Sequence, residues 1–247
     1  FLKYYPMSDI LFAYIFSIYG NEYGCKMIKK IDILGIQLDN YTVREAIMRV
    51  EAWYDNNMLN VIEMVSMQML TESETDPVLK EVISSLNLAV IGEKGILQAA
   101  GADTMQRIRE TEENDFSNEF LKRVERNRKS VFIIGETQAA VDELKQELEE
   151  EYPKLVLAGA AATENCVGDL EGVINELNAA TPDVIISIIP SPKQEYFLVE
   201  HRDKINANVW YGIGGFEVHR KRSKIKGFFW NLVHRVRLKN SIEKYES

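Results

Sequence analysis

An apolar run over residues 184–189, broken only by Ser187, ends at Pro190 and is followed by a segment with helical spacing of apolar residues. A short run of this kind, closed by proline, is typical of a buried strand. Since proline favours the first turn of a helix, we predict that Lys193, Gln194 and Glu195 lie in such a turn, beyond the carboxyl end of the strand. Open α/β sheets bind ligands at this edge, so these side chains are the first site candidates.

The rest of the chain alternates strand-like and helix-like segments with short connections, as successive βαβ units require. We therefore predict an α/β fold: a Rossmann-like, mostly parallel sheet flanked by helices, with a basic amphipathic C-terminal helical appendage. The spacing of Thr42 and Glu45 is that of a capping box and predicts a helix that ends near Asp55. Strands are expected at residues 31–36, 60–66, 89–91, 131–134, 155–158, 184–189 and 208–213.

Length and composition favour one sizeable domain over two. With 247 residues, 46% of them hydrophobic and 27% charged, the chain has the make-up of an ordinary soluble globular protein. Residues 1–26 precede Met27 and contain an apolar stretch too short to span a bilayer. We expect residues 1–26 to be an extension outside the fold, 27–217 to be the α/β domain and 218–247 to be the appendage.

Metal and cofactor sites are not expected. Cys25, Cys166 and the three histidines show no metal-ligand spacing. Gly212, Gly214 and Gly215 do not complete a dinucleotide-binding fingerprint, which also needs a helix directly after the glycines. These glycines either turn the chain at a strand end or let a ligand approach the backbone.

Two motifs follow the last two expected strands: Pro192-Lys193-Gln194-Glu195, and Gly212-x-Gly214-Gly215-Phe216. Together with Asp39-Asn40 and Asp76-Pro77 upstream, they resemble the WecG/TagA/CpsF family of bacterial glycosyltransferases. The resemblance extends over roughly residues 28–240. It implies transfer of an N-acetylmannosamine-type sugar from a UDP-sugar to a polyprenyl-diphosphate-linked acceptor, by a cytoplasmic protein peripheral to the inner face of the cell membrane.

Several positions depart from the family pattern. Met64 and Ser66 stand where the family has a Thr-x-Asn motif. Gly92 stands where the family has the aspartate proposed as catalytic base, and Glu93 is the adjacent carboxylate. Positioned proton transfer contributes about 10²–10⁴-fold to a rate, so a displaced base bears directly on turnover.

The resemblance also implies roles for individual residues. Glu93 and Gln194 are the catalytic candidates, and Gln194 matches a family position implicated in the sugar site. Arginines of the appendage are implied to contact the acceptor diphosphate, but the family's Arg-Ala-Pro motif is absent, which leaves their assignment open. The substrate-binding candidates are Ser66, Gly92, Lys193, Glu195, Gly214, Gly215, Arg220, Arg222, Arg235 and Arg237.

The appendage is basic and the body is acidic. Residues 218–247 contain nine Lys and Arg and two Glu, a net charge of +7 in a chain whose total is −9. Phe229, Leu232 and Val236 recur at helical spacing among these basic residues, which favours a helix lying on an anionic membrane surface. The alternative is that this apolar stripe packs on the protein's own core. Nucleic acid is not an expected partner, because the acidic body would repel its phosphates.

Two functions stay open from the sequence. The first is a peripheral membrane glycosyltransferase that acts by direct, metal-independent displacement, with Glu93 or another carboxylate as base. The second is a catalytically inactive relative that serves as a binding or assembly component of envelope polysaccharide synthesis. The sequence does not distinguish a monomer from a homo-oligomer.

Overall fold

The computed structural model describes residues 29–56, 58–166 and 170–214. Within these residues, six parallel strands form the central sheet in the order β4-β3-β8-β7-β5-β6. The strands are β3 (Asn60–Val65), β4 (Leu88–Ile91), β5 (Ser130–Gly135), β6 (Val156–Ala162), β7 (Val184–Ser187) and β8 (Val209–Gly212). The predicted α/β fold with a parallel sheet is confirmed.

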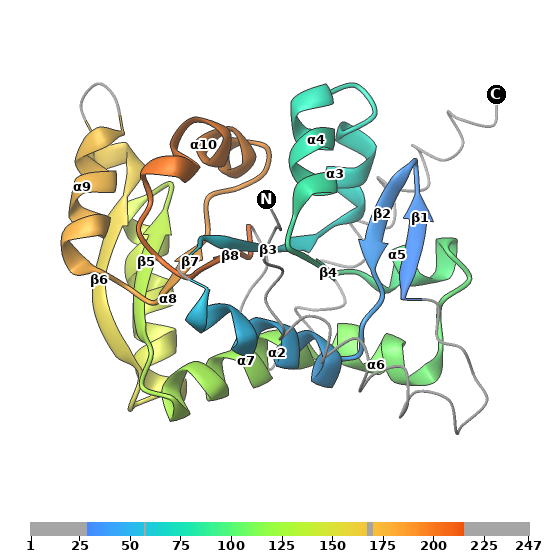
Figure 1. Cartoon of the computed structure of the whole chain (residues 1–247), viewed down its shortest axis with the longest axis horizontal. Coiled ribbons are helices and arrows are strands. Elements are labelled where there is room, and N and C mark those ends of the chain that lie inside the picture. The colour runs from blue at the N-terminus through green and yellow to red at the C-terminus, as the bar shows by residue number, and fades with distance from the viewer. Residues whose placement is uncertain (1–28, 57, 167–169, 215–247) are drawn as a thin grey trace, which may run out of the picture.

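Helices cover both faces of the sheet (Figure 1). On the upper face lie α3 (Met67–Glu72), α4 (Pro77–Ser85), α9 (Glu171–Ala180) and α10 (Lys193–His201). On the lower face lie α2 (Val43–Glu51), α7 (Asp115–Arg126) and α8 (Gln138–Glu151). The remaining helical segments are η1 (Ala52–Asp55), α5 (Lys94–Ala99), α6 (Met105–Glu112), η2 (Thr163–Asn165) and η3 (Arg202–Lys204).

Side chains alternate between the two faces along each strand and so join different cores. On β3, Ile62 and Met64 belong to the lower core with α2, α7 and α8. Val61 packs in the upper core with α9 and α10, and Val65 packs with α3, α4 and α5. This alternation fixes which side of the sheet each polar residue of β3 can reach.

The strand expected at residues 31–36 is wrong as a single strand. The segment forms an antiparallel hairpin outside the main sheet, with β1 (Lys30–Ile33) paired to β2 (Ile36–Asp39). Leu34 and Gly35 at its tip have φ values of 54° and 78°. Positive φ at both central residues is the requirement of a two-residue type I′ hairpin turn. The hairpin buries Ile31, Ile36 and Leu38 against the α3–α5 side of the fold.

The expected capping box is confirmed. The Thr42 hydroxyl accepts from the Glu45 backbone N–H, and the Glu45 carboxylate accepts from the Thr42 N–H, at the start of α2. The expected helix end at Asp55 is also met, because η1 continues α2 to that residue. Within the described residues, no helix has the length and apolar character needed to cross a membrane.

Candidate functional site

The carboxyl ends of β4, β3, β8 and β7 lie side by side at one edge of the sheet. In the parallel register, Glu63 on β3 pairs with Gly212 on β8, which also pairs with Ser187 on β7. Val65, the last residue of β3, pairs with Ile91 at the end of β4. The candidate segments therefore follow neighbouring strands, in the order Gly92-Glu93, Ser66, Gly214 and Lys193-Gln194-Glu195. Gly215, Arg220, Arg222, Arg235 and Arg237 lie outside the described residues.

Gln194 lies in the first turn of α10, as predicted, and is 2% exposed. Its Nε2 donates a hydrogen bond of 3.1 Å to Glu63 Oε1, whereas its own Oε1 is buried without a hydrogen-bond partner among the described residues. A Cβ at Gly212 would come within 2.7 Å of Gln194 Oε1 and closer still to Nε2. The amide therefore needs a glycine at the end of β8.

Glu195 and Lys193 flank Gln194 but point into different surroundings. Glu195 is fully buried, and burial raises the pKa of its carboxyl. Lys193 is exposed and forms an ion pair with Glu136, directly after β5. Of these two substrate-binding candidates, only Lys193 has its charge at the surface.

Glu63 is a buried acid that the sequence analysis did not select. Its side chain is 0% exposed on a central strand, and its pKa is raised well above the usual range, first by burial and then by the charge of Glu195. The sequence does contain a signal for it, because a single carboxylate interrupts the apolar run of residues 61–65. Glu63, Gln194 and Glu195 together form a buried polar cluster between the sheet and α10.

Glu93 and Ser66 both cap helix α3. Glu93 Oε1 accepts from the backbone N–H of Met67 at 3.1 Å, and Ser66 Oγ accepts from the N–H of Met69 at 3.1 Å. Gly92 lies between β4 and Glu93, and its N–H donates to the Val65 carbonyl at 3.0 Å. One oxygen of Glu93 is thus occupied by the cap, which leaves Oε2 as the atom that could accept a proton.

Asp76, of the Asp-Pro motif, has a structural explanation as well. Its Oδ1 accepts from the backbone N–H groups of Val78 and Leu79, at 3.0 and 3.1 Å, and Pro77 occupies the first turn of α4. The Tyr196 hydroxyl of α10 donates to the other oxygen of Asp76. Asp76 therefore caps the N-terminus of α4 and also links α4 to α10 through the hydrogen bond from Tyr196.

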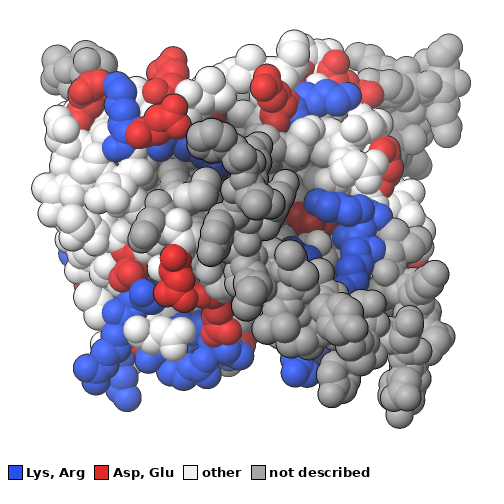
Figure 2. All heavy atoms as spheres, viewed as in Figure 1, with Lys and Arg blue, Asp and Glu red and all other residues white. Residues whose placement is uncertain are grey.

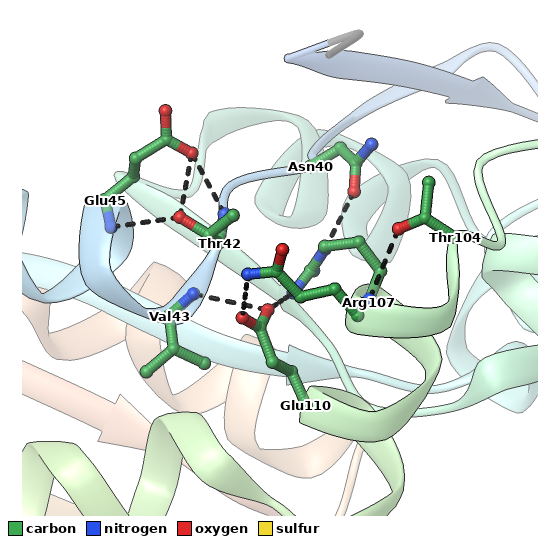
Figure 3. Close-up of polar contacts among 8 residues, drawn as sticks. Asn40, Thr42, Val43, Glu45, Thr104, Arg107 and Glu110 are labelled. Carbon is green, nitrogen blue, oxygen red and sulfur yellow. Dashed lines mark hydrogen bonds and ion pairs between the residues drawn. The ribbon is translucent and has the colours of Figure 1, made fainter. Parts of the chain in front are cut away.

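A second polar group lies on the lower side of the sheet, beside a pocket lined by Asp39, Met64, Arg107, Glu110 and Ser117 among others. Figure 3 shows Arg107 of α6 reaching Asn40 and Glu110. Its Nη1 lies 2.6 Å from Glu110 Oε2, and its Nε donates to Asn40 Oδ1 at 3.0 Å.

Both side chains of this ion pair are 7% exposed. Neither Arg107 nor Glu110 was selected from the sequence, because an Arg and a Glu three residues apart are ordinary on a helix and the contact of Arg107 with Asn40 spans 67 positions of the chain. Met64, at the position where a family threonine was expected, faces this pocket rather than Gln194, because successive residues of β3 point to opposite faces.

The described surface carries charges of both signs. Figure 2 shows Lys and Arg gathered at the lower left, where α7 ends, with Asp and Glu beside them, and charges of both signs along the upper edge. The α7 cations are partly compensated: Arg123 Nη1 lies 2.7 Å from Glu51 Oε1, and Arg126 Nη2 lies 3.8 Å from the same oxygen. Among the described residues, no group of three or more His, Cys, Asp or Glu is arranged to hold a metal ion.

Comparison with known proteins agrees with the resemblance predicted from the motifs. Similar proteins include the N-acetylglucosaminyldiphosphoundecaprenol N-acetyl-beta-D-mannosaminyltransferases of Staphylococcus aureus strains NCTC 8325 / PS 47 and COL. Each is 24% identical over 191 residues, which cover 75% of this chain and 73% of the relative. Residues 31–219 match the family described as glycosyl transferase WecG/TagA/CpsF, a range that includes every strand from β2 to β8 and the edge on which the candidate residues lie. This chain belongs to the WecG/TagA/CpsF family of glycosyl transferases.

Proposed function

We propose that this protein transfers an N-acetylhexosamine, of the N-acetylmannosamine type, from a UDP-sugar to a polyprenyl-diphosphate-linked acceptor in cell-envelope polysaccharide synthesis. The observation that carries the proposal is the Gln194 amide. It is buried at the carboxyl edge of the sheet, and its Oε1 accepts no hydrogen bond from the described residues. Sugar hydroxyl and acetamido groups supply such donors. The names of the Staphylococcus aureus relatives, which specify a mannosaminyl transfer to a lipid-linked N-acetylglucosaminyl diphosphate, support the choice of substrates.

The reaction is a direct displacement. A hydroxyl oxygen of the acceptor forms a bond to the anomeric carbon of the donor sugar, and the bond from that carbon to the diphosphate oxygen breaks. UDP leaves with the bonding electrons, and the hydroxyl proton passes to a base. With Gly92 at the family's base position, Glu93 is the candidate, acting through Oε2 while Oε1 keeps the cap on α3.

The alternative is a binding or assembly component that does not turn over. Three positions favour it: Gly92 has no side chain, Met64 faces the lower pocket, and Ser66 already caps α3. This alternative keeps the fold and the binding edge but lacks a positioned base.

Glu93→Gln separates these functions, because the amide oxygen of glutamine can still accept from the Met67 N–H while the side chain no longer accepts a proton. The measurements are calorimetric titration with UDP and UDP-N-acetylhexosamines, and a product assay with a short-chain prenyl-diphosphate-linked N-acetylglucosamine acceptor. We expect Glu93→Gln to reduce transfer by about 10²-fold or more without a change in donor affinity. Glu81→Gln, an exposed change on α4, is the control and should retain full transfer.

The outcomes are distinct. Donor binding with no transfer by the unmodified protein supports the non-catalytic alternative. Transfer that survives Glu93→Gln rules out Glu93 as the base. Binding of neither UDP nor any UDP-sugar contradicts both functions.

The membrane part of the proposal concerns residues 218–247, which lie outside the described residues. We propose that Arg220, Arg222, Arg235 and Arg237 supply contacts to the acceptor diphosphate, and that the basic appendage holds the protein on the anionic inner face of the cell membrane. Liposome flotation of the full chain should require anionic lipid and weaken as salt rises. Equal flotation after deletion of residues 218–247 would show that the appendage is not the anchor.

A further inference from the structure

The cluster of Glu63, Gln194 and Glu195 is short of hydrogen-bond donors. Three buried carboxyl oxygens, Glu63 Oε2 and both oxygens of Glu195, have no hydrogen-bond partner among the described residues. Both side chains are 0% exposed, so bulk water does not supply the missing donors. Buried polar atoms of this kind call for an explanation.

The described part of the chain places no compensating positive charge beside the pair. Glu72 of α3 and Asp76 at the start of α4 are the charged groups that face Glu195, and both are acidic. The Tyr196 hydroxyl is directed to Asp76. The Ser191 hydroxyl is near enough to favour the ionised form of Glu195, but it makes no hydrogen bond of good geometry among the described residues, and burial outweighs it. Among the described residues, no Lys, Arg or His forms an ion pair with Glu63 or Glu195.

Two adjacent buried carboxyl groups without a cation do not both ionise, and the usual solution is one proton held between them. Glu195 follows Gln194 in the chain, and Gln194 Nε2 lies 3.1 Å from Glu63 Oε1, which brings both carboxyl groups to the same amide. In agreement, Glu195 raises the pKa of Glu63 both by its charge and by a hydrogen bond to its acid form. A proton between Glu63 Oε2 and Glu195 supplies a donor at the point where the donors are missing.

The position of this proton determines how Gln194 is oriented. A proton on the Oε2 side leaves Glu63 Oε1 as a pure acceptor, so the Gln194 amide must turn its Nε2 toward it, at 3.1 Å. The amide carbonyl then points the opposite way from Nε2, and a side chain larger than glycine at position 212 would collide with both ends of the amide.

We propose that Glu63 and Glu195 share one proton at neutral pH and together are positioning residues, which present Gln194 Oε1 as a fixed acceptor for an O–H or N–H of the bound sugar. The first part of the proposal, that Gln194 Oε1 accepts from the bound sugar, rests on the proposed transferase function. The second part, that the shared proton orients the Gln194 amide, does not depend on that function.

Ligand-free measurements on the full chain test the second part. The unmodified protein should show the infrared C=O stretch of a protonated carboxylic acid at pH 7, and Glu63→Gln and Glu195→Gln should each remove it, because the glutamine amide replaces the proton as donor. In protein with ¹⁵N-labelled glutamine, the Gln194 side-chain N–H should be protected from hydrogen exchange in the unmodified protein and in Glu63→Gln, and unprotected in Glu63→Leu. Absence of the protonated carboxyl at pH 7, or equal protection in Glu63→Leu, would overturn the proposal.

Sugar-nucleotide binding tests the first part. Glu63→Gln should bind UDP-N-acetylhexosamine as the unmodified protein does. Glu63→Leu and Gln194→Ala should each weaken binding about tenfold, and the double variant should bind no more weakly than either single variant. If the two losses of binding free energy add in the double variant, Glu63 does not act through Gln194, and the proposal is refuted. If no UDP-sugar binds the unmodified protein, the proposed function fails. The infrared and exchange measurements then still test whether Glu63 and Glu195 share a proton and orient the Gln194 amide.

Discussion

The ion pair between Arg107 and Glu110 allows a stability prediction with a defined magnitude. Arg107→Met keeps much of the apolar stem but leaves the Glu110 carboxylate, 7% exposed, without its cation. The remaining donors to Glu110 are Gln106 Nε2 at 2.8 Å and the Val43 N–H at 3.4 Å, and neither carries charge. Removing one partner of a buried pair typically costs about 3–5 kcal/mol, which corresponds to a fall in Tm of roughly 6–20 °C for a chain of this size.

Urea unfolding of Arg107→Met, Glu110→Leu and the double variant measures this cost. The double variant should lose less than the sum of the two single losses, because it buries no unpaired charge. Arg123→Met is the matched control, since Arg123 pairs with Glu51 with 32% of its side chain exposed, and exposed pairs contribute about 0–1 kcal/mol. A loss below about 1 kcal/mol for Arg107→Met, or additive single losses, would refute the reasoning.

Three further predictions concern alkaline pH, packing and capping. Burial raises the pKa of Tyr211 above its usual range and that of Tyr152 to about 12, so above pH 10 the unfolded chain releases protons that the folded chain retains. The free energy of unfolding should therefore fall by about 1.4 kcal/mol per pH unit for each tyrosine in urea melts above pH 10, and Tyr211→Phe should reduce the slope. Gly135→Ala would place a Cβ 2.7 Å from Val141 Cγ2 and 2.9 Å from Ile188 Cγ1 and should cost about 1–3 kcal/mol in the same assay, whereas an unchanged urea midpoint would contradict tight packing at this position. Ser66→Ala removes the hydrogen bond that caps α3 and should cost about 1 kcal/mol, and an unchanged urea midpoint would contradict the capping role.

The sheet could be predicted because most of its strands are short runs of apolar residues in the sequence. The run at residues 184–189 contains β7 (Val184–Ser187), and α10 begins at Lys193 as expected. The strand expected at 155–158 is longer in the structure, because β6 continues through Gly159 and three alanines. Glycine and alanine are poor strand formers, and it is pairing with β5 and packing of the Phe132 ring on Gly159 that hold this segment extended.

The candidate site was predictable in its location but not in its contacts. A strand followed by a proline and a helix places Gln194 at the carboxyl edge whatever its neighbours are. Its partner Glu63 depends on the register between β3 and β8 and on the docking of α10, and both arise from tertiary pairing. The same holds for Arg107 and Asn40, which are joined across 67 positions of the chain. Glu93 and Ser66 could be selected as candidates, but their common role in capping α3 appears only once β3 and β4 are placed side by side.

The alternation along β3 limits where a ligand could meet both polar groups. Glu63 faces Gln194 above the sheet, and Met64 faces the Arg107 pocket below it. A strand separates the two sides, so a ligand in contact with both must lie across the carboxyl end of β3, over Ser66 and the adjoining loop of Gly92 and Glu93. A base supplied from Glu93 would then stand between the two polar groups. Loss of transfer in Glu93→Gln with unchanged binding is therefore the result that this geometry predicts for an enzyme, whereas a binding component needs only the groups on either side.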